Sequence, residues 1–519
     1  MNFNKKLAVA VSGAVLLMAG QVAMADSTSD IVDALVGKGV LTEEEGKLIT
    51  KGHESKTKVT PVVKEKDGSF TLESANGRNS IGLTGRMHLD YRNSDTEDVG
   101  TTSDRDTASL ADQFELRRAR IGIKGKFAKD FKYELVTNIP GTATVDVAYL
   151  DFAKYDQVQL RVGKFKQPFG LEELISSNNM TMMERSYLAQ TAPSKKLGFQ
   201  VMGAPTTGMT YAASVFQHND TELDISSDGK NSAAARATIN FAEIMGNKEM
   251  VMHLGLSGLE SNYAVRSAQS SQSDKTYGGT SNNTQTATIS SFRSAGRGLS
   301  NIFRGQVYGV PCTTSEIACA SEFTTSVKQQ AVGLEGIFAS GPFKLMGEYS
   351  RGDYRGRGSY TASSNEVKYD TETYFLEAGY FITGEKYADS YKGGVFSSFK
   401  PKKEFDLDKG DLGAIELAFR AEGFDVDDTT LSAAGAGRFQ GILSTGNTGS
   451  TSSSTNNSGV KSGAKTYTGG VRWILNPNLV VKANYAVTNF DSAFKPIDVA
   501  NGIAIDQEKL LMLRTQYMF

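Results

Sequence analysis

Apolar and polar side chains alternate with a period of two residues along most of the chain beyond residue 80. This period is typical of β-strands that have one face in apolar surroundings and the other in water. In the last segment, Leu511, Leu513 and Phe519 share one face, and Arg514 and Gln516 share the other. Together with the turn signals between segments, the alternation predicts sixteen strands, over 80–92, 112–127, 130–139, 144–153, 157–165, 197–204, 207–217, 231–242, 248–260, 327–338, 342–352, 371–383, 411–423, 465–475, 478–489 and 508–519.

The connections between these strands fall into two classes of length. Short turns such as 128–130, 204–207, 340–342 and 476–478 alternate with long polar loops over 93–111, 166–196, 261–326, 353–370, 424–464 and 490–507. Transmembrane barrels have this asymmetry, with short periplasmic turns and long outer loops. We therefore expect an all-β, antiparallel transmembrane β-barrel in the outer membrane of a Gram-negative bacterium. The segment 384–410 is long on the short-turn side, so it is either a periplasmic excursion or contains a further strand.

The first 79 residues have a different pattern. Lys5 and Lys6 precede an apolar stretch over 7–19, and the small residues around Met24 complete a secretory signal peptide over 1–25. Within 26–60, an apolar stripe at helical spacing and the capping box from Thr42 to Glu45 predict short helices. These helices form either an oligomerising stub in the periplasm or a partly ordered leader. We expect 61–79 to be a linker to a barrel domain over 80–519.

Composition narrows the class of protein further. Beyond the signal peptide, no run approaches the roughly 20 apolar residues that a membrane-spanning helix needs, which leaves a soluble periplasmic protein or a barrel. The 53 glycines and 10 prolines suit many turns between strands. A length of 519 residues would suggest about three ordinary domains. No boundary follows residue 70, however, so we expect one large unit.

The two cysteines, Cys312 and Cys319, lie in one polar stretch. In an oxidising compartment, their spacing suits a disulfide that closes a small surface loop. The four histidines do not cluster with them, so we expect no metal site and no cofactor.

The net charge of −2 conceals a separation of charge between strand faces. In the strand 112–127, the residues Arg118, Arg120, Lys124 and Lys126 share one face. An arginine on the lipid face near the midplane costs roughly 2 to 4 kcal/mol, so this face must line a wet lumen. With Arg117 beside them and no acid at neighbouring lumen positions of that strand, these residues predict a basic stripe that attracts anions.

Two further segments carry expectations about the lumen. Glu416, Arg420 and Glu422 share a face of the strand 411–423, which we interpret as a solvated, mixed-charge wall. The loop 166–196 contains enough apolar residues to pack against a wall. We expect it to fold inward and narrow the channel, because sixteen strands otherwise enclose a wide bore.

Several segments match a known family in the same order along the chain. They are 114–132 with the paired Arg117 and Arg118, then 163–172, 176–177, 184–185, 384–401, 470–473 and the terminal strand. From about residue 70 to the end, the chain resembles the phosphate-selective porins O and P. The resemblance implies a homotrimer of sixteen-stranded barrels with an inward third loop and an arginine-lined route to a central anion site.

The resemblance also implies roles for single residues. The basic side chains of Arg86, Arg117 and Arg118 would line the route. Asp146 would be the acidic member of the central site, and Ser176 and Ser177 would donate hydroxyls. The chain departs from the family at Glu173, where phosphate-selective members carry a lysine, and a carboxylate there would repel phosphate. The full channel-lining set is therefore expected to be Arg86, Arg117, Arg118, Arg120, Lys124, Asp146, Glu173, Ser176 and Ser177.

These observations predict an outer-membrane porin for small anionic solutes such as phosphate, with membrane lipid as its other partner. A less selective general porin and a non-conducting solute receptor or structural barrel are the alternatives. An enzyme is disfavoured, because His88 is the one histidine on a convincing lumen face and a hydrolytic site needs further groups beside it. Nothing in the sequence indicates nucleic-acid binding.

Overall fold

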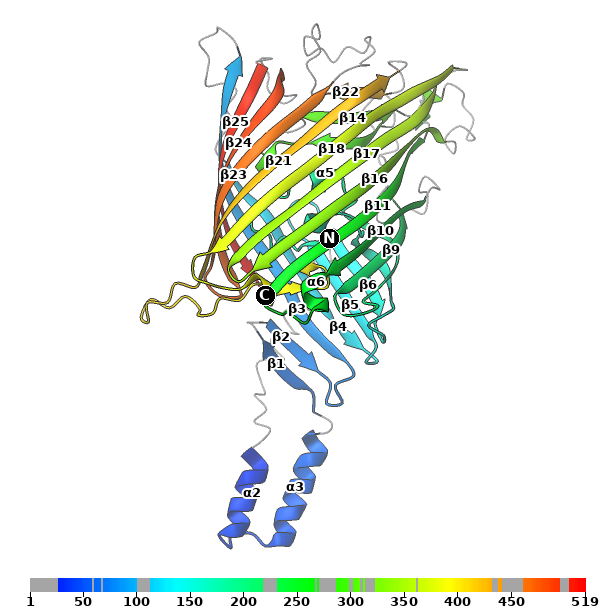
Figure 1. Ribbon diagram of the computed structural model, residues 1–519. Helices are drawn as coiled ribbons and strands as arrows, with labels where there is room; N and C mark the ends of the chain where they lie inside the picture. The colour runs from blue at the N-terminus through cyan, green and yellow to red at the C-terminus, as the bar shows by residue number, and fades with distance from the viewer. Residues whose placement is uncertain are drawn as a thin grey trace.

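The chain forms a closed antiparallel β-barrel with a helical hairpin that projects from one end (Figure 1). The computed structural model describes residues 27–57, 60–66, 69–99, 113–217, 231–266, 268–269, 286–297, 302–308, 311–312, 323–360, 363–431, 437–440, 461–494 and 504–519. Each wall strand pairs with the next one along the wall, and the last pairs with the first, which closes the barrel. The sixteen wall strands are β3 (Ser80–Val99), β4 (Gln113–Phe127), β5 (Phe131–Asn138), β6 (Thr144–Phe152), β7 (Gln159–Lys166), β8 (Lys195–Gly203), β9 (Met209–Gln217), β10 (Asn231–Asn240), β11 (Met250–Arg266), β16 (Phe323–Ser340), β17 (Phe343–Tyr360), β18 (Ser363–Phe381), β21 (Ala414–Leu431), β23 (Ser462–Ile474), β24 (Leu479–Phe494) and β25 (Ala504–Met518).

The sixteen predicted strands and their order are confirmed, but several extend beyond the predicted bounds. For example, β18 begins at Ser363, whereas the alternation predicted a start at residue 371. In the outer part of this strand, Val367 and Tyr369 are buried inside the barrel, whereas Lys368 and Asp370 lie on the other face. The apolar face is therefore the inner one there, which reverses the pattern of the membrane part, although the backbone ladder continues.

The wall is uneven in height. Strands β5 to β10 contain 8 to 10 residues, whereas β16 to β18 contain 18 or 19. We call β5 to β10 the low wall. We call the taller part of the barrel, formed by β16 to β18, β21 and β23 to β25, the high wall; its last three strands contain 13 to 16 residues. The outward residues are apolar on both sides, as Leu256 and Leu334 illustrate, while lumen-facing His253 and Glu335 are buried. This is the face assignment that the alternation predicted.

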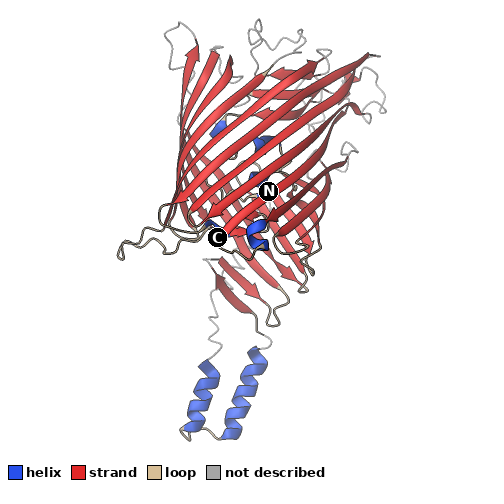
Figure 2. Ribbon diagram, viewed as in Figure 1, coloured by secondary structure: helices blue, strands red, loops and turns tan. Residues whose placement is uncertain are grey.

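The segment over 26–60 is largely helical, as expected. Helix α2 (Ser27–Gly37) packs antiparallel to α3 (Glu43–Thr57), and Figure 2 shows the pair standing away from the barrel. The predicted capping box is present: the backbone N–H of Glu45 donates to Thr42 Oγ1, and the backbone N–H of Thr42 donates to Glu45 Oε2. This hydrogen bonding, led by the backbone of Thr42, lowers the pKa of Glu45.

The expectation of a plain linker over 61–79 was wrong. The segment contains a β-hairpin of β1 (Val62–Lys66) and β2 (Ser69–Glu73), and β2 continues the sheet by pairing with the start of β3. The sequence carries an Asp67-Gly68 pair between the two strands, which is a strong hairpin signal that the high charge of the segment concealed.

The long segment between β18 and β21 is a periplasmic excursion, with no additional wall strand. It lies at the short-turn end, and its first half contains a 3-10 turn, η5 (Tyr387–Ser390), and the two-residue strands β19 (Tyr391–Lys392) and β20 (Val395–Phe396). This half folds into the lumen, where Tyr387, Phe396 and Phe399 pack on Phe381. Another insertion, β13 (Thr286–Phe292) and β14 (Phe303–Tyr308) with β22 (Gly437–Gln440), packs inside the opposite, outer end.

No helix in the described part of the chain is long and apolar enough to cross a membrane.

Candidate functional site

The loop between β7 and β8 lies inside the barrel, as predicted. We call residues 167–194 the inner loop; it contains the short helices α4 (Leu171–Leu174) and α5 (Leu188–Thr191). Phe169, Leu171 and Tyr187 are completely buried. The apolar residues that suggested wall packing therefore do pack against the wall.

The inner loop is held against the high wall by polar side chains that reach out from the strands. Glu348 of β17 accepts hydrogen bonds from the backbone N–H groups of Leu171 and Glu172, at 2.5 and 2.8 Å. Arg420 of β21 binds the carboxylate of Glu172 at 2.9 Å. These contacts fix the first turn of the inner loop.

Further along the loop, side chains of β23 to β25 donate to its backbone carbonyls. Lys482 binds the carbonyl of Met180 at 2.6 Å, and Arg514 binds that of Met183 at 2.5 Å. Arg472 donates to the carbonyl of Asn179 at 2.9 Å. These three basic residues are therefore occupied by the loop.

This arrangement corrects the expectation of a solvated wall on the strand 411–423. Glu416, Arg420 and Glu422 are almost completely buried beneath the inner loop. A charged face at a lumen position can bind water or another part of the chain, and the alternation pattern does not distinguish the two. Here it binds the loop.

On the opposite side of the inner loop lies a cavity of about 1190 Å³. Its walls are strands β3 to β10, the inner loop, and the inward tip formed by β19 and β20. Among the described residues, ten basic and four acidic side chains line it: Arg86, Arg117, Arg118, Arg120, Arg161, Arg185, Arg236, Lys166, Lys195 and Lys392, with Glu134, Asp146, Asp156 and Glu173.

Most of the residues expected to line the channel meet in this cavity. Of the nine, only Lys124 is not among its lining residues. Lys124 lies toward the short-turn end of β4, beside Gly82 and Glu134, and its side chain is exposed. The basic stripe is therefore shorter than the sequence suggested.

Arg117 reaches the lumen because β4 contains a bulge. Strict alternation would aim it at the lipid, since Arg118 faces the lumen. The pairing with β3 shifts between His88 and Leu89: His88 lies opposite Arg118, whereas Leu89 lies opposite Leu116. Arg117 is thus the extra residue, and such a bulge can re-aim a side chain. Two consecutive arginines are thereby available on one face.

Arg117 has an acidic partner, and this acid comes from outside its own strand. Its guanidinium binds Glu184 of the inner loop, at 3.0 Å from Nε to Oε1. Glu184 also binds Arg514 at 2.8 Å and Arg92 at 3.1 Å. Burial alone would raise the pKa of Glu184, but the guanidiniums of Arg117 and Arg514 hold that pKa well below its usual value. The compensating acid comes from the loop, so the strand sequence alone did not reveal it.

Asp146 of β6 accepts from two cations. Arg120 of β4 approaches it at 2.8 Å, and Lys195, the first residue of β8, approaches it at 2.5 Å. Arg86 donates to Ser177 at 3.0 Å and to Ser176 at 3.4 Å. The acidic and hydroxyl groups expected at the central site therefore lie in one cavity with the basic groups.

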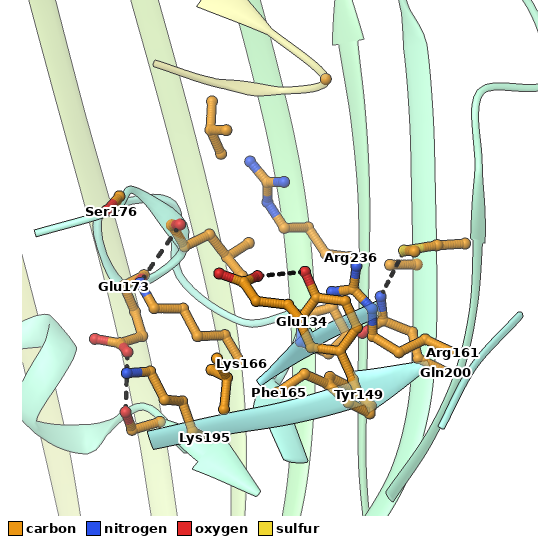
Figure 3. Close-up of a pocket in the computed structure, with 18 of the residues that line it drawn as sticks. Glu134, Tyr149, Arg161, Phe165, Lys166, Glu173, Ser176, Lys195, Gln200 and Arg236 are labelled. Atoms are coloured by element: carbon orange, nitrogen blue, oxygen red, sulfur yellow. Dashed lines mark hydrogen bonds between the residues drawn. The ribbon is translucent and has the colours of Figure 1, made fainter. Parts of the chain in front are cut away.

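The carboxylate of Glu173 does not stand alone in the cavity. Arg185 binds it at 3.1 Å, and the hydroxyl of Ser194 donates to its other oxygen at 3.1 Å. Figure 3 shows Glu173 beside Lys166 and Lys195. The Lys166 ammonium donates to the backbone carbonyls of Glu173 and Ile175, so it holds the loop. The paired carboxylate adds little net negative charge.

Sequence reasoning missed Lys195 as a lining residue, along with Arg161, Arg185 and Arg236. One signal could have found it: Lys166 and Lys195 flank the inner loop at the ends of adjacent strands and lie directly opposite each other. Arg236 could also have been found, because it is the one charged residue of β10 and Ala235 and Ala237 take the lipid face. Its contact with the tip of β19 and β20, where it donates to the Gly394 carbonyl at 2.8 Å, depends on the tertiary structure.

The expected disulfide involves Cys319, which lies outside the described residues, so it stays a prediction.

A channel-shaped barrel with an inward loop and a charged lumen defines the class of protein as a membrane pore. The family model of the phosphate-selective porins O and P matches residues 81–300 and 316–519. The chain therefore belongs to this family of porins and is an outer-membrane β-barrel of a Gram-negative bacterium.

The chain is also similar to individual proteins. The chain is 26% identical to Porin O of Pseudomonas aeruginosa over 470 residues, which are 88% of this chain and 92% of that protein. Among solved structures, the outer membrane channel DcaP of Acinetobacter baumannii is 10% identical, with a TM-score of 0.46 over 85% of this chain and 97% of that one. An anion-selective porin from Comamonas acidovorans is 11% identical, with a TM-score of 0.43 over 85% of this chain and 100% of that one.

Proposed function

We propose that the protein conducts small anions across the outer membrane through the cavity beside the inner loop. The observation that carries this proposal is the excess of basic over acidic side chains among the described lining residues, ten against four. A narrow pore lined by arginine and lysine attracts anions and repels cations. Relatives in the family are porins, and membership supports a channel over an enzyme.

The test is the reversal potential of the purified full chain in planar bilayers under a potassium chloride gradient. We expect a sign that corresponds to chloride passing more readily than potassium. A reversal potential near zero would favour a general porin, and the absence of current would favour a receptor or a structural barrel.

Phosphate is the first solute to examine, because the family model is named for phosphate selectivity and arginine can bind phosphate with paired donors. The pairing of Glu173 with Arg185 supports retention of a phosphate site despite the missing lysine. Micromolar phosphate that blocks the chloride current would support this substrate. A current that is insensitive to phosphate would point to other anions.

We further propose that the protein forms homotrimers through the low wall. An apolar groove of about 920 Å³ lies on this wall, lined on its floor by the small residues Ala213, Ala233, Ala235 and Gly258 and at its edges by residues such as Phe199. Lipid tails and a second copy both suit an apolar groove. The low wall favours a second copy, because strands of 8 to 10 residues are at the lower limit for spanning a bilayer.

A further inference from the structure

The second half of the excursion between β18 and β21 projects sideways from the barrel. We call residues 400–413 the side loop. Figure 1 shows it standing out beyond the wall at the short-turn end, on the side of β21 and β23. It contributes nothing to the lining of the cavity among the described residues.

The side loop has a shape fixed by its own hydrogen bonds. The backbones of Asp406 and Asp411 bind each other in both directions, at 2.9 and 3.0 Å. The carboxylate of Asp406 also accepts from the backbone N–H groups of Asp408 and Lys409. These hydrogen bonds hold the tip of the side loop, residues 407–410, in one conformation.

The side loop is fastened to the outer surface of the barrel by Trp473, the single tryptophan of the chain. The indole N–H donates to the carbonyl of Leu412 at 2.6 Å, and the ring of Phe405 packs edge-on against the indole at 5.4 Å. The Phe405 N–H donates to the carbonyl of Leu475 at 2.7 Å. Tryptophan is enriched where a membrane protein meets the membrane–water interface.

Two leucine side chains of the side loop are exposed. Leu407 at the tip is 79% exposed, and Leu412 is 55% exposed. Tyr380 in β18 and Ile382 just after it are also exposed. The backbone N–H of Ile382 donates to the carbonyl of Ile415, which lies opposite Trp473, so the apolar surface extends from the barrel to the loop. Lys409 is paired with Asp406, and Lys403 with Asp411. Over residues 400–413 the four lysines equal the four acidic residues in number, so the side loop carries no net charge.

We propose that the side loop is a lipid anchor, with Leu407 and Leu412 inserted in the periplasmic leaflet of the outer membrane. Its apolar residues are continuous with the lipid-facing surface of the barrel, and Trp473 sets them at the level of the interface. The ion pairs of Lys403 with Asp411 and of Lys409 with Asp406 stay at the level of the lipid headgroups, and the two leucines are removed from water. The low wall lies on another part of the barrel, which favours lipid over a second copy as the occupant.

The test uses tryptophan fluorescence of the full chain in vesicles of phosphatidylcholine with brominated acyl chains, which quench tryptophan on contact. The parent chain, with Trp473 alone, sets the reference. Leu407→Trp is compared with Leu48→Trp in α3, a residue that is 75% exposed in the hairpin away from the barrel. Leu412→Trp is a second variant in case the first fails to fold.

We expect the signal added by Leu407→Trp to be quenched as strongly as that of Trp473, and the signal added by Leu48→Trp to be unaffected by bromine. An added signal from residue 407 that behaves like that from residue 48 would overturn the proposal. A blue-shifted signal without quenching would also overturn it and indicate contact with a second copy. Ion selectivity plays no part in this readout, so the test is independent of the proposed function.

Discussion

At the scale of single residues, the basic side chains of the lumen fall into two groups. Basic residues on the high wall, such as Lys482 and Arg514, are buried and bound to the inner loop. Basic residues on β3 to β10 remain along the cavity, although several have an acidic partner. Some cavity residues, such as Lys166 and Arg117, also bind the inner loop, so the two groups differ in whether they line the cavity.

Lys195 provides the sharpest test of the cavity group. Replacing it with glutamine removes one of the two cations at Asp146, so the cavity becomes less positive. We expect the Lys195→Gln channel to shift its reversal potential toward potassium and to bind phosphate more weakly. Lys124→Gln is the matched control, because Lys124 is a lumen-side lysine that does not line the cavity. An equal shift in both variants would contradict a site at Lys195.

The pairing of Glu184 predicts a dependence on pH. The pKa of Glu184 is lowered in the folded chain, from a usual value of 4.5. A lowered carboxyl pKa stabilises the fold fully above the usual value, and this contribution is lost as pH falls through the folded-state pKa. We therefore expect the difference in conductance and selectivity between the parent and the Glu184→Gln channel to stay constant from neutral pH down to 4.5. The Glu184→Gln channel serves as the comparison, and a change in the parent above pH 4.5 that this variant lacks would contradict the assignment.

At the scale of elements, the inner loop is ordered by the strands around it. Its two helices have only four residues each, which is too short to be stable alone. The loop therefore takes its shape from side chains of β17 and of β21 to β25. A channel whose width depends on such a loop should change when one anchor is removed.

Lys482→Met removes an anchor and leaves the carbonyl of Met180 without its donor. An unsatisfied buried polar group costs about 1–3 kcal/mol, so we expect the middle of the loop to detach. Single-channel conductance should rise and anion preference should fall. Thr50→Ala in α3, far from the lumen, is the control for general effects of substitution. Unchanged conductance in a folded Lys482→Met barrel would show that the remaining anchors suffice.

At the scale of the whole molecule, the proposed trimer uses the low wall, whose strands are the shortest of the barrel. An arginine placed in the groove of the low wall should separate the protomers. We expect Ala235→Arg to lower the fraction of trimer in detergent, measured by light scattering. Leu376→Arg, which faces outward from the high wall, carries the same charge and is the control. Loss of the trimer in both variants would indicate a general effect of charge on the surface.

Much of the architecture could be predicted from the sequence because it follows from local rules. Each strand reveals its period over a few residues, and the turn lengths reveal which end of the barrel is which. The inner loop was predicted from its length and its apolar residues. The β1–β2 hairpin was missed, because β1 is charged and lacks a clear alternation, although Phe70 and Leu72 alternate with polar residues in β2.

The sequence by itself determined the sixteen strands, their lipid and lumen faces, and a set of charged and hydroxyl residues, eight of which meet in one cavity. Only the tertiary structure decided that the bulge turns Arg117 inward and that Arg185 neutralises Glu173. It also decided that cations of the high wall, such as Arg514, bind the inner loop. The physical reason is distance along the chain. A period of two is written in neighbouring residues, whereas an ion pair such as Arg514 with Glu184 joins groups that only the closed barrel brings together.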